Sequence, residues 1–452
     1  MAIAPVLPGN DRDETISTMP PDTGFLPRQP NPRRAFLALL ALGLLLRLAA
    51  ALYMGDKVLP LPGIWDQLSY DELAWRVVNG HGLSLAQDGW PYTRANVPTS
   101  FWSFLYTGFL SAVYGLVGHH PLVARMIQAL LAGVLGPWLA WRLGKRLLGV
   151  EAGRAAALLS SFYLYFVYFS AALMTETFTI LAILTLLERA LALTDRPPEA
   201  PAAERDWAIW GLCIGVAGLI RQVALLPVPL LALWMLWRRP TRDTWLGLTL
   251  SAAVALALFL PFTLRNYRIF HRPVLLNTNA GFAFFWANHP VHGTNFMPIL
   301  PDDGPTYQQL IPPELRHLDE AGLNDALMAR GLGFVAADPA RYIKLTVSRV
   351  KAYFMFWPSP ESGRLSNLVR VLSFGLALPF MLYGLWLSRP LWRRSMPVYL
   401  YMGSYVMLHL FSWALIRYRL PVDGVLLVFA GGAVAALKDR WFRPGVTAEV
   451  KA

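Results

Sequence analysis

The chain has 452 residues, of which 55% are hydrophobic and only 15% charged, against roughly 25% charged residues in soluble domains. Its apolar residues fall in blocks of about 15–25, long enough to cross a hydrocarbon core of roughly 30 Å as helices, which excludes an ordinary soluble protein. The net charge of +12 does not indicate a nucleic-acid partner, because the basic residues cluster between apolar blocks as in the cytoplasmic loops of membrane proteins. We therefore predict an all-α polytopic membrane protein with no nucleic-acid partner. Cys213 is the single cysteine, so an intrachain disulfide is excluded.

The chain begins with a stretch rich in Pro, Asp and Thr, residues 1–34, for which we predict a disordered cytoplasmic tail rather than a signal peptide. Arg33 and Arg34 precede the first apolar block, 35–54, and place its start in the cytoplasm. The loop 55–120 is then extracytoplasmic. It begins with the densest acidic cluster close to any apolar block, which runs from Asp66 to Glu72.

The apolar stretch 101–117 admits two interpretations. If it crossed the membrane, the basic loop that follows 122–141 would lie outside, against the charge rule, so we predict a juxtamembrane or re-entrant helix on the outer face. Ten spans result, or eleven if this stretch crosses. The predicted spans are residues 35–54, 122–141, 155–169, 177–193, 207–220, 223–237, 244–262, 366–387, 396–413 and 422–437.

These spans divide the chain into regions with different expected roles. Residues 35–262, with the outer loop 55–120, form an N-terminal transmembrane catalytic module, and residues 263–365 form a mostly polar extracytoplasmic region. The C-terminal transmembrane helices occupy 366–437, and 438–452 is a cytoplasmic tail.

Ionisable residues that abut apolar blocks, away from the basic loops, all fall at outward-facing helix ends in this topology. A charge in the bilayer core costs about 3 kcal/mol, so such residues usually face a cavity and usually have a function. Their convergence on one face predicts a single extracytoplasmic site. The residues are Asp66, Asp71, Glu72, Arg94, Glu176, Arg221, Arg265, Arg417 and Arg419.

Each of these residues also has a structural interpretation. Glu176 could pair with an arginine only to hold helices together, and Arg221 could be a snorkelling interfacial arginine. The arginine pairs beginning at Arg265 and Arg417 could anchor lipid headgroups or could clamp a phosphate.

His289 and His292 could bind a metal, but a proline separates them and no cysteine or acidic residue completes a ligand set, so we predict no metal site. Nucleotide-binding motifs are absent from the sequence, so the energy for a reaction has to come from an activated substrate in the membrane.

Several short motifs occur in a characteristic order along residues 35–437. They are Asp66-Gln67-Leu68-Ser69-Tyr70, Leu173-Met174-Thr175-Glu176, Arg265-Asn266-Tyr267, Thr278-Asn279-Ala280-Gly281, Ala287-Asn288 and Arg417-Tyr418-Arg419. In this order they resemble the integral-membrane GT-C glycosyltransferases, particularly the aminoarabinose-transferase and protein O-mannosyltransferase (PMT-like) group. Gln67 stands where the family has an acidic residue, and Arg94 stands where a lysine is common.

The resemblance implies a polyprenyl-phosphate sugar donor, such as an undecaprenyl phosphate sugar, and inverting transfer to a lipid, glycan or protein acceptor on the periplasmic side of a bacterial cytoplasmic (inner) membrane. Asp66 would be the general base, and Arg94, Arg265, Arg417 and Arg419 would neutralise the leaving phosphate. No cofactor or metal is expected. The sugar or acceptor pocket would be lined by Tyr70, Asp71, Glu176, Arg221, Asn266, Asn279, Asn288 and Tyr418.

Two alternatives stay open. One is a secondary transporter or lipid-linked glycan carrier, which the lack of an internal repeat and the gathering of polar residues at one face disfavour. The other is an oligosaccharide ligase that uses a lipid-linked glycan.

Overall fold

The structure is a computed structural model that describes residues 31–61, 64–197, 202–301, 303–359 and 362–442. Contacts divide the chain into Met1–Ala38 and Leu39–Ala452. The described part of the first unit is only the start of one helix, so the fold is that of the second unit. The terminal tails predicted for 1–34 and 438–452 lie largely outside the described residues. Within the described ranges the chain is helical, with isolated β-bridges but no β-strand.

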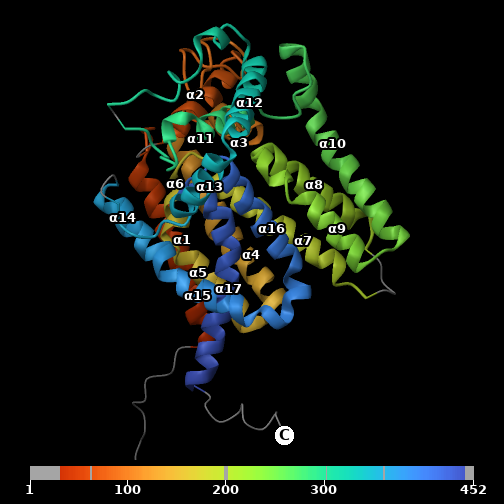
Figure 1. Ribbon diagram of the computed structural model, residues 1–452. Coiled ribbons are helices and arrows are strands. Elements are labelled where there is room, and N and C mark those ends of the chain that lie inside the picture. The colour runs from red at the N-terminus through yellow and green to blue at the C-terminus, as the bar shows by residue number, and fades with distance from the viewer. Residues whose placement is uncertain (1–30, 62–63, 198–201, 302, 360–361, 443–452) are drawn as a thin grey trace, which may run out of the picture. The chain divides into compact units, whose positions relative to one another are not determined.

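The predicted all-α polytopic membrane protein is confirmed (Figure 1). Among the described residues, six helical segments are long and apolar enough to cross a membrane: Pro32–Met54, Pro121–Leu148, Glu176–Thr194, Arg242–Phe270, Arg364–Leu387 and Ile416–Arg440.

Every predicted span overlaps one or more helical segments of the structure. These elements are α1 (Pro32–Met54), α4 (Pro121–Leu148), α5 (Val150–Phe162) with α6 (Leu164–Ala171), α7 (Glu176–Thr194), α8 (Glu204–Ile220), η1 (Gln222–Leu225) with α9 (Val228–Arg238), α10 (Arg242–Phe270), α14 (Arg364–Arg370) with the π-helical turn η4 (Val371–Gly375) and α15 (Leu376–Leu387), η5 (Arg389–Leu391) with α16 (Trp392–Phe411), and η6 (Ile416–Arg419) with α17 (Leu420–Phe442). Four of the ten are too short, interrupted or too polar to be among the six, so the count of ten stays a prediction.

The predicted continuous span 155–169 is wrong in one respect, because the helix breaks at Tyr163. This residue has an extended backbone between α5 and α6. Its hydroxyl donates to Asp423 Oδ2 of α17 at 2.8 Å, and Asp423 is fully buried. A buried carboxylate needs hydrogen-bond donors, and this contact fixes the position of the break.

The stretch 101–117 contains α3 (Phe104–Val117), which the Ser103 hydroxyl caps by accepting from the Tyr106 amide. Its 14 residues extend about 21 Å as a helix, less than the roughly 30 Å of a hydrocarbon core. The helix packs against α2 (Asp66–Val78). The segment Gln222–Arg238 is similarly short, so the juxtamembrane or re-entrant placement of α3 stays a prediction.

The region 263–365 is more ordered than the predicted polar loop. Helix α10 continues to Phe270, and the region contains α11 (Ala280–Asn288), α12 (Glu320–Ala337) and α13 (Pro339–Tyr353), with the short turns η2 (Pro290–His292) and η3 (Pro313–Leu315). Its own core is aromatic: Trp286 and Phe296 are buried against Trp413 from the end of α16. Burial of large rings gives this region a core separate from that of the long helices.

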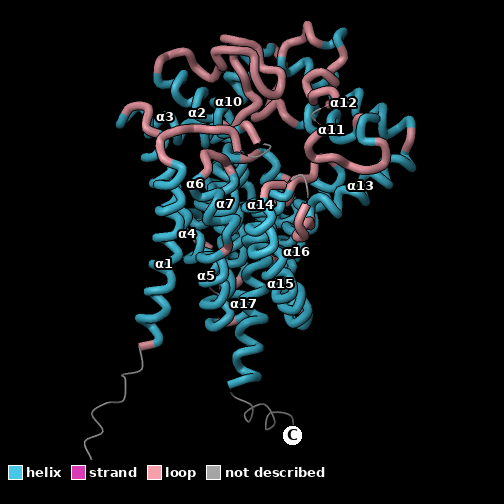
Figure 2. The backbone as a smooth tube through the Cα atoms, turned by 90° about the vertical axis from the view of Figure 1, so that its left-hand side faces the viewer, coloured by secondary structure: helices cyan, strands magenta, loops and turns pink. Residues whose placement is uncertain are grey.

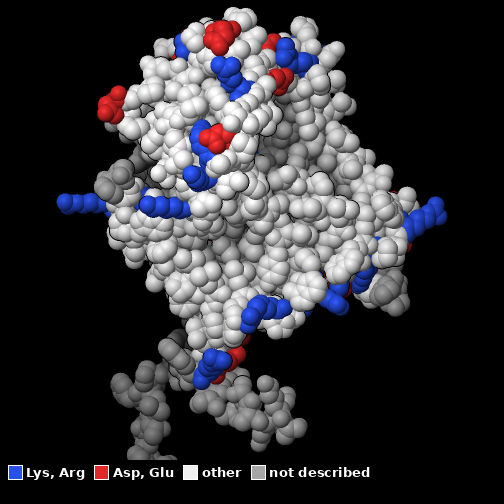
Figure 3. Space-filling model, in the orientation of Figure 1, with Lys and Arg blue, Asp and Glu red and all other residues white. Residues whose placement is uncertain are grey.

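The short helices and loops gather at one end of the long helices. Figure 2 shows α2, α3, α11, α12 and α13 at this end, which we call the Asp66 end. On the face in Figure 3, a broad band without Lys, Arg, Asp or Glu separates charged residues near the two ends. Such a band suits the hydrocarbon layer of a bilayer.

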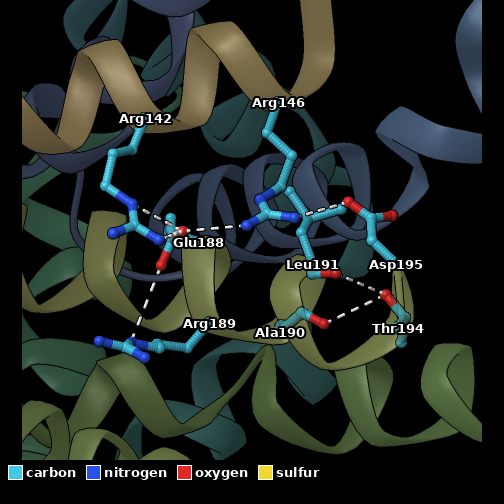
Figure 4. A network of polar contacts seen from close by, with 8 residues as sticks. All are labelled: Arg142, Arg146, Glu188, Arg189, Ala190, Leu191, Thr194 and Asp195. Carbon is cyan, nitrogen blue, oxygen red and sulfur yellow. Dashed lines mark hydrogen bonds and ion pairs between the residues drawn. The ribbon is translucent and has the colours of Figure 1, made fainter. Parts of the chain in front are cut away.

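An ion network holds α4 and α7 together at the end opposite to Asp66 (Figure 4). Glu188 Oε1 accepts from Arg142 at 2.6 Å and lies 3.3 Å from Arg146, and Glu188 Oε2 lies 3.8 Å from Arg189. Arg146 also pairs with Asp195 at 2.8 Å. Because Glu188 is buried, these cations compensate the loss of its hydration.

Close approach of α5 to α17 depends on a glycine. A Cβ added at Gly431 would lie 2.5 Å from the Ala152 carbonyl oxygen. Small residues at such crossings let membrane helices pack backbone to backbone.

Candidate active site

Four ionisable residues from distant parts of the chain lie where helices begin or end. Asp66 is the first residue of α2 and Glu176 the first residue of α7. Arg221 follows the last residue of α8, and Arg417 lies in η6 just before α17. Helix N-termini carry partial positive charge, which favours carboxylates at the two acidic positions.

These four side chains form one cluster, which we call the acid–arginine quartet. Arg417 Nη1 lies 2.6 Å from Asp66 Oδ2 and 3.6 Å from Glu176 Oε1, and Arg221 Nη2 lies 3.5 Å from Glu176 Oε1. Asp66 and Arg417 are 22% and 11% exposed, whereas Glu176 is fully buried and Arg221 is 19% exposed. Two carboxylates thus balance two guanidiniums, with Asp66 on the more accessible side.

Aromatic rings line the quartet. The Tyr418 ring lies 4.8 Å from the Arg221 guanidinium and 5.1 Å from that of Arg417, and it stacks on His409 at 4.8 Å. Both arginines therefore gain cation–π contact and a fixed orientation. Tyr70 is buried one turn after Asp66. Burial, assisted by the Asp66 charge, raises the pKa of the Tyr70 hydroxyl, so this group stays protonated.

The quartet retains spare hydrogen-bonding capacity. Within the described ranges, Glu176 Oε2 and Arg417 Nε are buried without a hydrogen-bond partner, and Arg417 Nη2 makes only a 3.5 Å contact to the Tyr418 hydroxyl. An arginine with a free Nε and Nη2 can bind two oxygens of a phosphate side by side. Because Arg417 Nε is itself buried, an anion reaches it only after neighbouring side chains move, while the pair between Arg417 Nη1 and Asp66 can stay in place.

The predicted convergence of all the ionisable residues has to be corrected, because three of the predicted phosphate ligands are bound elsewhere. Arg419 donates to Asp423 at 2.9 Å and to the Tyr353 carbonyl oxygen at 2.7 Å, fully buried. Arg94 is exposed and donates to the Arg316 carbonyl oxygen.

Arg265 belongs to a second polar cluster. It donates to the Ser100 hydroxyl at 2.9 Å and to the Thr99 carbonyl oxygen at 3.1 Å. Asn266 is buried beside it, accepts from Ser100 and donates to the Leu276 carbonyl oxygen at 2.8 Å. These contacts join α10 to the loop before α3, so Arg265 lies in a cluster of its own, and its predicted phosphate contact stays a prediction.

The remaining predicted pocket residues are also separate from the quartet. Asp71 accepts from the Tyr114 hydroxyl at 2.6 Å and lies 3.0 Å from His119 Nε2. Asn288 is buried and accepts from Arg349 at 2.7 Å, and Asn279 lies half-buried at the start of α11.

The sequence does not predict the hydrogen bonds of two polar residues, Gln67 beside Asp66 and Glu320 in the Arg265 cluster. Buried Gln67 donates to the Leu59 carbonyl oxygen and accepts from the Leu173 amide at 3.3 Å, which ties the start of α2 to the break before α7. Glu320 accepts from the Ser100 amide at 2.8 Å and from the Thr278 hydroxyl, and burial raises its pKa. Gln67 follows Asp66 directly, and Glu320 is the first residue of α12, so each position could have been noticed in the sequence. Their hydrogen-bond partners could not, because most of these lie far away in the chain.

Both ring nitrogens of His292 have partners within the protein. His292 Nε2 lies 2.8 Å from the Trp286 carbonyl oxygen, and its Nδ1 accepts from the Met297 amide at 3.3 Å. In the described ranges, no group of three or more His, Cys, Asp or Glu side chains is placed to hold a metal ion.

Comparisons with known proteins bear on this geometry. The family model described as dolichyl-phosphate-mannose-protein mannosyltransferase matches residues 103–264, which include Glu176 and Arg221. The oligosaccharyltransferase AglB from Archaeoglobus fulgidus, in complex with an inhibitory peptide and a dolichol-phosphate, superposes with a TM-score of 0.54 at 14% identity over 91% of this chain and 51% of that one. The chain shares the fold of this oligosaccharyltransferase.

A second structure of the same oligosaccharyltransferase, with Zn and sulfate, gives a TM-score of 0.52 at 14% identity over 89% of this chain and 49% of that one. ArnT from Cupriavidus metallidurans, bound to undecaprenyl phosphate, gives 0.40 at 15% identity over 91% and 79%. No curated protein matched the chain. The chain spans about half the length of the oligosaccharyltransferases that it matches. The resemblance inferred from the sequence motifs, to the GT-C and PMT-like group, is confirmed.

Proposed function

We propose that this GT-C chain is a glycosyltransferase that moves a sugar from a polyprenyl-phosphate donor to an acceptor at the Asp66 end of the helices. One observation carries the proposal: a partly exposed carboxylate lies 2.6 Å from an arginine whose Nε has no partner within the described residues. The first group suits proton abstraction, and the second suits a leaving phosphate. The dolichol-phosphate bound to AglB supports a lipid-linked donor.

In the proposed reaction, Asp66 takes the proton of an acceptor hydroxyl as the acceptor oxygen attacks the anomeric carbon. The bond from that carbon to the phosphate oxygen breaks, and the polyprenyl phosphate leaves with the electron pair. Attack from the face opposite to the phosphate inverts the anomeric centre. Arg417 neutralises the charge that develops on the phosphate, while Arg221 keeps Glu176 compensated. We propose further that the reaction needs no metal, because Arg417 supplies positive charge at the leaving phosphate.

Replacement of Asp66 tests this mechanism. Asp66→Asn removes the proton acceptor and keeps the shape, so transfer in liposomes should fall by about a hundred- to ten-thousand-fold while donor binding is retained. Glu314→Gln, an exposed change in η3, serves as the matched control. Wild-type turnover by Asp66→Asn would exclude the base assignment. Unchanged turnover of the wild type in excess EDTA is the expected result for metal-independent transfer.

The identity of the glycan can be tested in the same assay. The likeness to an oligosaccharyltransferase favours, as a second candidate, a protein that transfers a preassembled lipid-linked glycan. Donors with one sugar and with several sugars on the same polyprenyl phosphate distinguish the two. Turnover of the oligosaccharide donor alone would replace the monosaccharide proposal.

We further propose that the chain resides in the cytoplasmic membrane of a bacterium, with the quartet on the periplasmic side. The excess of arginine in the loops at the opposite end supports this orientation, because such loops stay in the cytoplasm. A cysteine at Glu151, in the Cys213→Ala background, should react with a membrane-impermeant maleimide only after the cells are opened. Labelling of intact spheroplasts from outside would overturn the orientation.

A further inference from the structure

Helix α13 has an apolar face that no other part of the described chain covers. Its buried side carries Leu345 and Arg349. On the other side Ile343, Val347 and Val350 are 63%, 64% and 41% exposed. Their spacing of four and three residues places them in one stripe along the helix. Exposed aliphatic residues aligned in this way indicate a contact surface rather than scattered surface positions.

Hydrogen bonds fix the depth of α13 relative to the membrane helices. Arg349 donates to the Leu410 carbonyl oxygen at 3.0 Å, and the Tyr342 hydroxyl donates to the Phe411 carbonyl oxygen at 3.0 Å, both at the last turn of α16. At the other end of α13, the Tyr353 carbonyl oxygen accepts from Arg419 at 2.7 Å. Arg419 lies in the first turn of the candidate span Ile416–Arg440. The helix is therefore attached where membrane helices emerge from the hydrocarbon layer.

The charges on α13 complete an interfacial pattern. Lys344 and Lys351 are exposed, one residue after Ile343 and Val350, so both lie on the same flank of the apolar stripe. Lysine stems can lie along apolar surface while the ammonium groups reach the headgroup phosphates. An apolar stripe with lysines on its flank is typical of helices that lie in the plane of a bilayer surface.

We propose that the face of α13 formed by Ile343, Val347 and Val350 lies in the lipid leaflet at the Asp66 end, with Lys344 and Lys351 on anionic headgroups. The occupant of this face is the phospholipid surface, not a second copy of the chain. Since the opposite side of α13 holds the ends of α16 and α17, this contact anchors the region 263–365 against the membrane. The inference does not depend on whether a sugar is transferred.

Spin labels on the full-length chain test the proposal. In the Cys213→Ala background, single cysteines replace Ile343, Val347 and Val350, and Glu314→Cys serves as an exposed control. The protein is reconstituted in phosphatidylethanolamine vesicles that contain phosphatidylglycerol. For each spin label we compare the collision rate with dissolved oxygen to the collision rate with a water-soluble nickel chelate. The ratio of the two rates should be several-fold higher at the three stripe positions than at the control.

Two results would overturn the lipid contact. A nickel collision rate as high as at the Glu314 control would place the stripe in water. Low collision with both reagents, together with spin–spin broadening, would mean that a second copy of the chain covers it.

The lysines are tested separately. In the Lys344→Gln/Lys351→Gln variant, the oxygen collision rate of a spin label at position 347 should decrease in vesicles that contain phosphatidylglycerol. It should not change in vesicles of phosphatidylcholine alone. Equal values for variant and parent in both lipids would overturn the role of anionic headgroups.

Discussion

The pair of Arg417 with Asp66 gives the sharpest test of the quartet. Arg417→Ala removes the cation that lies 2.6 Å from Asp66 and 3.6 Å from Glu176, whereas Glu176 keeps Arg221 at 3.5 Å. Asp66 has no second cation among the described contacts. The loss should therefore fall mainly on Asp66, and the coupling of Arg417 to Asp66 should exceed its coupling to Glu176.

The size of the coupling depends on burial. Exposed ion pairs contribute about 0–1 kcal/mol, and removal of one partner of a buried pair costs about 3–5 kcal/mol. Asp66 and Arg417 are 22% and 11% exposed, so their coupling should lie between these limits, at about 2 kcal/mol. For the longer contact from Arg417 to Glu176 we expect about half as much.

A double-mutant cycle measures these couplings. Arg417→Ala, Asp66→Asn and their combination are unfolded by SDS in mixed micelles, and a second cycle uses Glu176→Gln. The change in the free energy of unfolding of the double variant should differ from the sum of the changes in the two single variants by the expected coupling. Additive effects within about 0.5 kcal/mol, or a larger coupling to Glu176 than to Asp66, would refute the arrangement of the quartet.

Three further predictions concern residues outside the quartet. Gln67→Glu should slow transfer by about a hundred-fold at alkaline pH, because only a protonated carboxyl can donate to the Leu59 carbonyl oxygen as the amide does. The transfer rate of this variant should therefore approach that of the wild type as the pH falls. A ratio of the two rates that stays constant with pH would contradict this. Glu188→Gln should lower the free energy of unfolding by about 1–3 kcal/mol without a change in donor KM, since it leaves the cations of Figure 4 without their shared carboxylate; unchanged stability would show that this network contributes nothing. Burial lowers the pKa of His292 from 6.5 to about 4, so the unfolded chain binds the proton first and about 3 kcal/mol of stability should be lost as pH falls from 6.5 to 4; amide exchange in the region 263–365 should report this loss, and His292→Gln should reduce it to the share of His289, whose pKa burial also lowers to about 4.

Features that depend on local pattern can be predicted well from the sequence. Blocks of apolar residues predict helices because each backbone group in lipid needs an intrahelical partner, and all ten predicted spans coincide with helices. Asp66 and Glu176 could be singled out because a charge next to an apolar block is costly unless it has a role. The break at Tyr163 could not be predicted, since the buried carboxylate that its hydroxyl contacts, Asp423, is far away in the chain.

Local pattern is therefore enough to predict the membrane class, the helices and the short set of ionisable residues at their ends. Which of these residues meet follows from the packing of the helices. Arg417 reaches Asp66 across 351 positions of sequence, whereas Arg419, two residues later, turns to Asp423. The physical reason is that a guanidinium at a helix end pairs with whichever carboxylate the packing of distant helices brings within reach, and sequence spacing carries no information about that distance.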